Sequence, residues 1–407
     1  MNSDKNGFLE TADRLGARLC RDAIWAGPRC NWMGDSMEFL NGNWTVAHRS
    51  FGPELYNGTS GVALFLGRLF AATGEDRFRL SAEGAIEQAL SRKSAMSAYA
   101  RIGFYTGLTG MAYVLTEIGR HAEAIRILEE LAADDLPAYG LDVLGGCAGA
   151  IPALLLMRQS LNRPLLLDFA VRLGERLLNT AEKSDFGWSW NTVNLPPEQP
   201  HQDLTGFSHG VAGIAWALLE LFQVTGDARF RTAAEEGFRY ERHWFDAERE
   251  NWPDFRSLYD PTAVSKTPGF PLAWCHGAPG IGLSRLRAYQ ITGDEIFRGE
   301  AEAAIRTTAK SLDYEGGSFA LCHGTAGNAE LLLYAAEVLG NSEYEAVAAK
   351  TGRDGIDKYE KQRNPWPCGV TGGGETPDLM LGLAGVGYFY LRLYDAEKIP
   401  PIVILAR

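Results

Sequence analysis

The hydrophobic positions of this chain form a repeated pattern of buried helices. Seven times, two glycines spaced as Gly-x-x-Gly are followed at once by a run that is apolar on nearly all sides, which is typical of a fully buried helix. The first glycines of these steps are Gly58, Gly107, Gly146, Gly210, Gly277, Gly324 and Gly382. The pattern therefore predicts seven buried helices, each starting at a glycine turn.

Between the buried helices lie segments in which apolar residues at helical spacing alternate with charges, as in a half-buried helix. Six of these segments follow a glycine step, and one precedes the first step and would complete the first helix pair. Their predicted ranges are 11–24, 78–90, 122–131, 165–178, 229–240, 296–312 and 344–359. Each repeat thus combines one buried and one half-exposed helix.

Helix-pair repeats form either an open solenoid or a closed ring. Solenoid repeats are nearly uniform and need polar caps, but the spacing of first glycines here varies from 39 residues (107 to 146) to 67 (210 to 277). The last repeat is also as apolar as the middle ones. We therefore expect an all-α fold, an α/α toroid of seven inner and seven outer helices, as one domain over residues 1–407. All seven glycine steps would then surround one mouth of the ring.

Three long segments interrupt the helices at residues 184–206, 245–273 and 362–377. The first two are rich in tryptophan, proline and polar residues, and loops of this length are usually functional or disordered. We expect them to form ordered walls above the mouth of the ring. The third contains Gly372-Gly373-Gly374 and is predicted to be more flexible.

Composition narrows the range of partners. The chain is 46% hydrophobic and 22% charged, as in ordinary globular proteins, and its net charge of −12 argues against a nucleic-acid partner. No apolar run approaches the roughly 18 residues of a membrane span. The N-terminus lacks the pattern of a secretory signal, and six cysteines in 407 residues are few, so we expect a reducing, cytoplasmic location.

Metal-binding side chains collect at two positions of the repeat. Cys275 and Cys322 lie two residues before the first glycine of the fifth and sixth steps, and His209, His276 and His323 lie directly before it in the fourth to sixth. Thiolate and imidazole are the ligands that zinc prefers, and a catalytic zinc takes three protein ligands and keeps one position open. The spacing favours Cys275 and Cys322 as ligands, with His323 or His276 as the third.

The motifs WCHGAPG and LCHGTAG around these cysteines, with the seven glycine steps, resemble the lanthionine synthetase C-like (LanC-like) cyclases, which are zinc α/α toroids. The resemblance covers nearly the whole chain and implies Zn²⁺ bound by Cys275, Cys322 and His323. It places the family's active-site histidine on His209 in GFSHGVAG and its aspartate on Asp142 in LDVLGG.

Two positions depart from the stand-alone members of that family, which carry an arginine four residues before the first cysteine and a tyrosine directly after it. Here these positions are Pro271 and His276, and PLAWCHGAPGIG is closer to the cyclase half of two-domain, class II lanthipeptide synthetases. A dehydratase half does not fit in 407 residues, so a separate dehydratase is an expected partner. Arg256 or Lys266 could supply the missing positive charge, although surface solvation is the simpler interpretation of both.

The resemblance implies a zinc-dependent lanthipeptide cyclase. A cysteine thiolate of a dehydrated precursor peptide would add to dehydroalanine or dehydrobutyrine, and His209 or His276 would protonate the resulting enolate. Asp142 would orient His209 or help to deprotonate the thiol. The simpler interpretations are a helix N-cap for Asp142 and a partner that orients a zinc ligand for His276. A closed structural zinc site completed by His276 is a further alternative.

Two other functions stay open at this stage. One is the addition of an external thiol, such as glutathione, to a dehydrated peptide with the same chemistry. The other is a non-catalytic peptide-binding or scaffold protein that uses the mouth of the ring.

Overall fold

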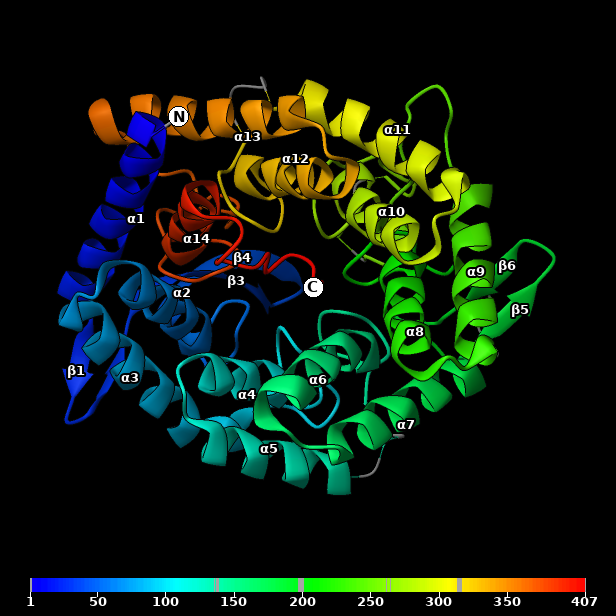
Figure 1. Ribbon diagram of the computed structural model, residues 1–407, viewed down its shortest axis with the longest axis horizontal. Coiled ribbons are helices and arrows are strands. Elements are labelled where there is room, and N and C mark those ends of the chain that lie inside the picture. Colours follow the sequence, from blue (N-terminus) through cyan, green and yellow to red (C-terminus); the bar gives the residue numbers. More distant parts are fainter. Residues whose placement is uncertain are drawn as a thin grey trace.

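Helices form two concentric rings around one axis (Figure 1). The structure is a computed structural model that describes residues 2–134, 136, 139–196, 201–260, 262–263, 265–312 and 317–406. In this part of the chain, the inner helices are α2 (Thr59–Thr73), α4 (Leu108–Glu117), α6 (Cys147–Leu161), α8 (Val211–Thr225), α10 (Ala278–Thr292), α12 (Thr325–Leu339) and α14 (Leu383–Tyr394). The outer helices are α1 (Asn2–Asp22), α3 (Asp76–Ser91), α5 (His121–Ala133), α7 (Leu165–Thr180), α9 (Ala228–His243), α11 (Glu295–Ser311) and α13 (Ser342–Gly355).

The predicted all-α toroid, with seven inner and seven outer helices, is therefore confirmed for the described residues. Short helical turns also occur at η1 (Lys93–Ala95), η3 (Phe255–Leu258) and η4 (Ile356–Lys361), so the helix predicted over 344–359 ends in a wider turn. The predicted single domain over 1–407 stays a prediction.

The first helix closes the ring, in a way that the sequence pattern did not indicate. α1 starts nine residues before the predicted range 11–24, and its main packing partner is α14 rather than α2. The ring of Phe8 in α1, for example, lies 6.0 Å from that of Tyr390 in α14. Helical periodicity shows that one face of α1 is buried but not which helix covers that face, so pairing of the two ends of the repeat array could not be deduced.

The second glycine of every step is required by the backbone itself. A Cβ atom at any of these seven positions would overlap the carbonyl oxygen six residues earlier. At Gly327, for example, that oxygen belongs to Leu321, and at Gly280 it belongs to Trp274. The chain therefore folds back tightly over the start of each inner helix, which holds the residues just before the first glycine at the mouth of the ring.

Backbone hydrogen bonds link neighbouring steps into a belt around this mouth. The residue two before the first glycine donates its N–H to the carbonyl of its counterpart in the next step, at 2.8–3.2 Å. The links run from Tyr56 to Tyr105, Tyr105 to Leu144, Leu144 to Ser208, Ser208 to Cys275, Cys322 to Met380 and Met380 back to Tyr56. Among the described residues, only the link between the Cys275 and Cys322 steps has no such hydrogen bond.

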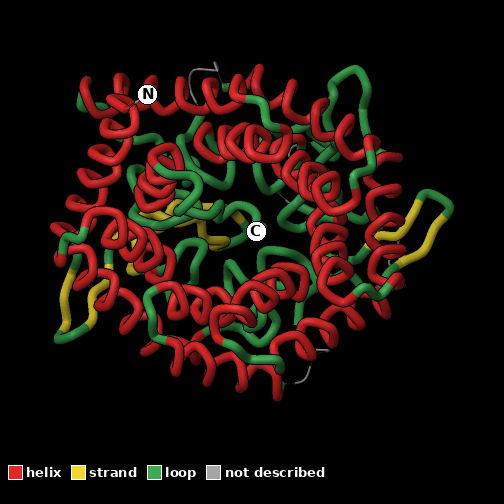
Figure 2. Tube along the Cα trace, in the orientation of Figure 1, coloured by secondary structure: helices red, strands yellow, loops and turns green. Residues whose placement is uncertain are grey.

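Three β-hairpins, which were not predicted, decorate the ring (yellow in Figure 2). They pair β1 (Ile24–Ala26) with β2 (Arg29–Asn31), β3 (Met33–Leu40) with β4 (Asn43–Ser50), and β5 (Glu182–Ser184) with β6 (Gly187–Ser189). Asn41 and Gly42, at the turn of the second hairpin, both have positive φ, 53° and 81°. An Asn-Gly pair is a strong hairpin signal, so this hairpin could have been predicted.

The C-terminal segment fills the axis of the ring, where Figure 1 shows the end of the chain. Ile402, Val403 and Ile404 are almost completely buried. The Tyr105 hydroxyl donates to the Ile402 carbonyl (2.7 Å), and the Trp274 indole N–H donates to the Val403 carbonyl (2.6 Å). The centre of the toroid is thus packed core rather than an open channel.

The predicted loops lie mostly within the described residues. Residues 197–200 of the first loop and residues 261 and 264 of the second lie outside them. The first loop begins at the last residue of β5 and contains β6, and the second contains η3. The predicted flexibility of 362–377 stays a prediction. No helix in the part of the chain that the structure describes has the length and apolar character needed to cross a membrane.

Candidate functional site

The side chains of Cys275 and Cys322 meet where the backbone belt is interrupted. Cys322 is buried and Cys275 is partly buried. A hydrogen bond from the Cys322 thiol lowers the pKa of Cys275 to about 6, against the opposing effect of burial, and the positive charge of Arg256 adds to the lowering. The same hydrogen bond and burial raise the pKa of Cys322. Two neighbouring cysteine sulfurs form a donor set suited to a soft divalent cation.

Tyr56 joins this pair from the first repeat. Its hydroxyl forms a hydrogen bond with the Cys322 sulfur, which lowers the pKa of Cys322, and burial raises the pKa of Tyr56 well above its ordinary value. The pattern of metal-binding residue types in the sequence does not include Tyr56. It nevertheless occupies the same repeat position as the two cysteines, two residues before the first glycine, and that shared position was the available signal.

His323 has the protonation pattern of a metal ligand. Its Nε2 lies 2.7 Å from the Gly369 carbonyl oxygen, to which it must donate, so that Nδ1 carries the lone pair. Metal-binding histidines commonly donate their second ring N–H to such a carbonyl. Among the described residues, however, Cys275, Cys322 and His323 are not a group whose ligand atoms all lie within 4.8 Å of one another. The structure brings the two sulfurs together, while His323 is held beside them by Gly369.

His209 and Asp142 form a direct pair across two neighbouring repeats. His209 Nδ1 lies 2.6 Å from Asp142 Oδ2, and Asp142 Oδ1 accepts a hydrogen bond from the Gly145 N–H at 2.8 Å. Gly146, not Asp142, is the N-cap residue of α6, and that cap has no side-chain hydrogen bond. The N-cap interpretation of Asp142 is therefore wrong. Asp142 instead orients an imidazole that is 31% exposed and keeps Nε2 available.

His276 is completely buried beneath His209, with ring centroids 5.8 Å apart and planes at 27°. Its Nδ1 lies 3.2 Å from the Thr205 carbonyl oxygen and 3.7 Å from Asp254 Oδ1, while its Nε2 has no hydrogen-bond partner in the described structure. Burial and the positive charge of Arg256 lower the pKa of His276 to about 3. The general-acid and positioning roles of His276 both stay predictions.

Arg256 and Lys266 differ in their surroundings. Arg256, in η3, donates from Nη2 to Asp254 Oδ2 at 2.7 Å and acts electrostatically on both Cys275 and Cys322. Lys266 instead donates to the Asp260 carbonyl at 2.7 Å. Arg256 is thus a cation whose charge acts on the thiol pair.

A surface pocket of about 520 Å³ reaches His323. Its other walls are Gly317, Ser318 and the segment 365–375. The pocket thus places His323, but neither Cys275 nor Cys322, at a hollow of the surface.

Sequence comparison relates the chain to one family and several of its members. The family model described as "Lanthionine synthetase C-like protein" matches residues 50–404. The chain is 22% identical to the nisin biosynthesis protein NisC of Lactococcus lactis subsp. lactis over 326 residues, which cover 72% of this chain and 76% of NisC. It is 22% identical to the glutathione S-transferase LANCL1 of Danio rerio over 283 residues, which cover 67% of each protein.

A third relative is much longer than this chain. The lacticin 481/lactococcin biosynthesis protein LcnDR2 of Lactococcus lactis subsp. lactis is 24% identical over 204 residues, which cover 47% of this chain and 20% of LcnDR2. The chain thus matches about a fifth of the length of that protein. Among solved structures, a nisin cyclase superimposes with a TM-score of 0.62 and 18% identity, over 85% of this chain and 88% of the other, which shows a common fold.

Proposed function

Because this chain belongs to the lanthionine synthetase C-like family, we propose that it is a zinc-dependent cyclase of dehydrated peptides. The observation that carries the proposal is the Cys275–Cys322 thiol pair, close enough to His209 for their charges to interact, at the mouth of the ring. The names of NisC and of the nisin cyclase structure support the same reaction class. Its products would be the thioethers lanthionine and methyllanthionine.

Cys275, Cys322 and His323 would hold Zn²⁺, the last through Nδ1. When bound, the cation would supply the positive charge that keeps a substrate thiol ionised near neutral pH. Two neighbouring sulfurs, and an imidazole whose Nε2–H is engaged by Gly369, fit this donor set. An open fourth position and a closed structural site would differ in whether an added thiol changes the absorption spectrum of the cobalt-substituted protein.

His209 would move the proton. Its Nδ1–H donates to Asp142, so Nε2 can accept the proton of the incoming peptide thiol. The sulfur then forms a bond to the β-carbon of the dehydro residue, and the electron pair of the carbon–carbon double bond moves toward the carbonyl as an enolate. His209 returns the proton to the α-carbon, so no other reactant is consumed. Arg256 would stabilise the negative charge of the enolate.

The substrate would arrive already dehydrated. A dehydratase activity would have to act on the peptide beforehand. The pocket at His323 and the loop segments 184–206 and 245–273 would guide the peptide to the thiol pair. The side chains of these walls would then decide which peptide binds and in which pattern its rings form.

A second candidate function is favoured by one observation, the name glutathione S-transferase of LANCL1. With the same residues, the thiol of glutathione would add to the dehydro residue of a peptide. A non-catalytic peptide-binding scaffold is the third possibility. The three functions predict different products from the same mixture.

The test is to incubate the protein with a dehydrated, cysteine-containing nisin-type precursor peptide, with and without glutathione. Free thiols are then alkylated and counted by mass spectrometry. Loss of alkylatable thiol without a mass change supports the cyclase, whereas a glutathione adduct supports the second candidate. If the protein binds one equivalent of zinc and the peptide stays unchanged, the result supports the non-catalytic scaffold. Cys322→Ala should abolish the reaction, with Cys20→Ala on the outer helix α1 as the matched control.

A further inference from the structure

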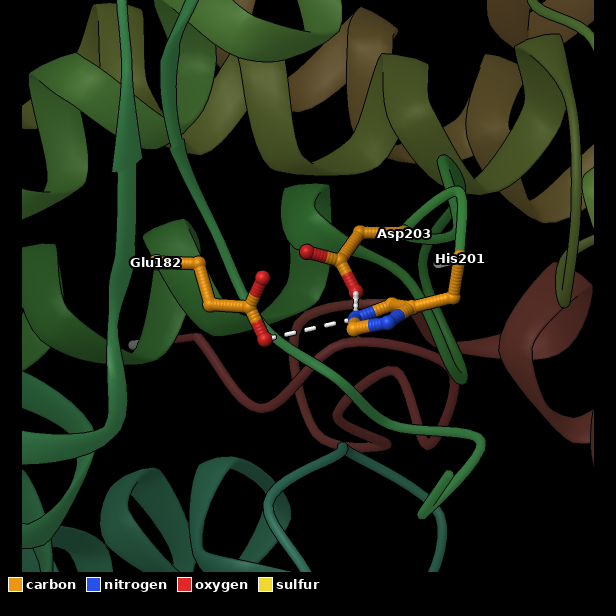
Figure 3. A group of neighbouring side chains, drawn as sticks. All are labelled: Glu182, His201 and Asp203. Atoms are coloured by element: carbon orange, nitrogen blue, oxygen red, sulfur yellow. Dashed lines mark ion pairs between the residues drawn. The ribbon is translucent and has the colours of Figure 1, made fainter. Parts of the chain in front are cut away.

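A second group of side chains that could bind a metal lies at the two ends of the first long loop (Figure 3). Glu182 is on β5, and His201 and Asp203 are in the segment that leads to the fourth glycine step. His201 Nε2 lies 3.3 Å from Glu182 Oε1 and 3.3 Å from Asp203 Oδ1. The three donor atoms all lie within 4.8 Å of one another.

The spacing of these atoms suits a common metal ligation sphere. With metal–ligand bonds of about 2.0–2.1 Å, two ligands of a tetrahedral zinc are about 3.3 Å apart. In Figure 3 the imidazole nitrogen and both carboxylates face one point. One nitrogen and two oxygens form a donor set that accepts Zn²⁺ and neighbouring divalent first-row cations. It differs from the thiol pair in containing no sulfur.

Burial makes the Asp203 carboxylate, with Glu182 beside it, unfavourable here without a cation. The side chains of His201 and Asp203 are 7% and 4% exposed, and Asp203 Oδ1 is buried with no hydrogen-bond partner in the described structure. Burial raises the pKa of Asp203 to about 6, and the nearby charge of Glu182 acts in the same direction. A divalent cation would neutralise this pair, since buried charges are normally paired or coordinated. The side chain of Glu182 is 50% exposed, so water can complete the coordination.

The surrounding residues hold the group in place. A hydrogen bond from Ser189 to the Asp203 carboxylate lowers its pKa, and Ser189 is paired with Glu182 in the β5–β6 ladder. The Tyr240 hydroxyl donates to the Asp203 carbonyl and the Tyr259 hydroxyl donates to the Gln202 carbonyl, both at 2.7 Å. Such partners orient metal ligands before the cation binds.

We propose that Glu182, His201 and Asp203 bind a divalent first-row transition cation, with Zn²⁺ as the probe, at a site independent of the cysteines. The cation would tie the β5–β6 hairpin to the segment 201–206. That segment contains Thr205, whose carbonyl contacts His276, and continues to His209. The site would therefore stabilise the segment 201–206, which leads to the fourth glycine step. This role goes beyond the proposed cyclase function and does not depend on it.

The test uses the Cys275→Ala/Cys322→Ala double variant, which removes the sulfur ligands. After chelator treatment and dialysis against Zn²⁺, we expect one bound equivalent. Adding Glu182→Gln should weaken this binding at least about tenfold, as loss of a ligand or of its support does. Glu129→Gln, an exposed change on the outer helix α5, is the matched control and should leave affinity unchanged.

Cobalt distinguishes the two sites in the wild-type protein. A thiolate-to-cobalt charge-transfer band reports the cysteines, while a second equivalent should add ligand-field bands without that charge transfer. Glu182→Gln should lose only the second component, and circular dichroism checks that the variant is folded. The proposal is overturned if the double variant binds no Zn²⁺, or if both Glu182→Gln and Asp203→Asn bind it as tightly as their parent. Neither result bears on the cyclase, which is scored by thioether formation.

Discussion

Asp142 and Asp378 occupy the same position in two repeats, four residues before the first glycine. Each accepts a hydrogen bond through Oδ1 from the backbone N–H three residues later, at 2.8 and 2.7 Å. Their second oxygens have different partners: Asp142 Oδ2 meets His209 Nδ1 at 2.6 Å, and Asp378 Oδ2 accepts from the Thr376 hydroxyl at 3.2 Å. One turn geometry thus orients a histidine in the third repeat and buries a carboxyl group in the seventh.

The buried carboxyl of Asp378 should make stability depend on pH. Burial raises its pKa from 3.8 to about 7. Below pH 4 both the folded and the unfolded states hold the proton. Between about pH 4 and 7 only the folded state keeps the proton. As the pH rises through this range, the free energy of unfolding should therefore fall by up to about 1.4 kcal/mol per pH unit. Asp378→Asn should reduce this dependence, because other buried carboxyl groups such as Asp203 contribute to it as well, and chemical denaturation at pH 5 and pH 7.5 measures the difference. An unchanged pH slope in the variant would contradict the assignment.

Asp142→Asn should reduce cyclisation by about 10²-fold or more, within the range expected for general acid–base catalysis. The amide no longer fixes the Nδ1–H tautomer of His209, so kcat should fall while zinc content stays the same. Asp378→Asn is the matched control, because it makes the same change at the same repeat position without a histidine partner. Equal kcat values for the two variants would refute the role of Asp142.

Tyr56→Phe should weaken zinc binding about tenfold, since it removes a hydrogen bond to a ligand sulfur. The control is Tyr105→Phe, the equivalent position in the second repeat, where the hydroxyl donates to the Ile402 carbonyl. That change should cost about 1 kcal/mol of stability and leave zinc affinity unaltered. Competition with a chromophoric chelator gives both affinities, and equal values would exclude a special role for Tyr56.

Arg256→Gln should lower kcat by about 10- to 100-fold, as loss of a group that stabilises developing negative charge does. Lys266→Gln should leave kcat close to that of the parent, because this lysine is engaged with the Asp260 carbonyl. The kcat values come from single-turnover thioether formation with excess enzyme. A larger effect of the lysine variant would reverse the assignment.

Gly327→Ala should destabilise the fold by about 1–3 kcal/mol, because the new Cβ overlaps the Leu321 carbonyl oxygen. Gly299→Ala, within α11 where the same atom meets nothing within 4 Å, should instead stabilise by about 0.5–1 kcal/mol. Urea unfolding of both variants measures the contrast. Loss of stability at both positions would show that helix context, rather than the turn, decides the outcome.

The sequence predicted the two rings well because apolar runs and glycine steps report burial and turning directly. It could not identify α14 as the partner of α1, since periodicity marks a buried face without naming what covers it. The short β5–β6 hairpin has no strong turn signal. The β3–β4 hairpin does have one, the Asn41-Gly42 pair at its turn. The group at Glu182, His201 and Asp203 has no regular spacing, and only the folded loop brings it together.

For the candidate site, the repeat register predicted that Cys275 and Cys322 would meet. It also aligned His209 with them, and the resemblance supplied Asp142. The register did not identify Tyr56 because a tyrosine carries no metal-binding signal by itself. The assignment of His323 as third ligand and the catalytic roles stay predictions, because they concern a cation and a substrate rather than the fold.

The filled axis sets an order of events during biosynthesis. Tyr105 and Trp274 find their hydrogen-bond acceptors only when Ile402 and Val403 have left the ribosome, and α1 finds its main partner only when α14 has done so. Contacts between such distant segments form slowly, and exposed apolar faces favour aggregation meanwhile. The ring can therefore close, and its centre can fill, only after this segment has been synthesised.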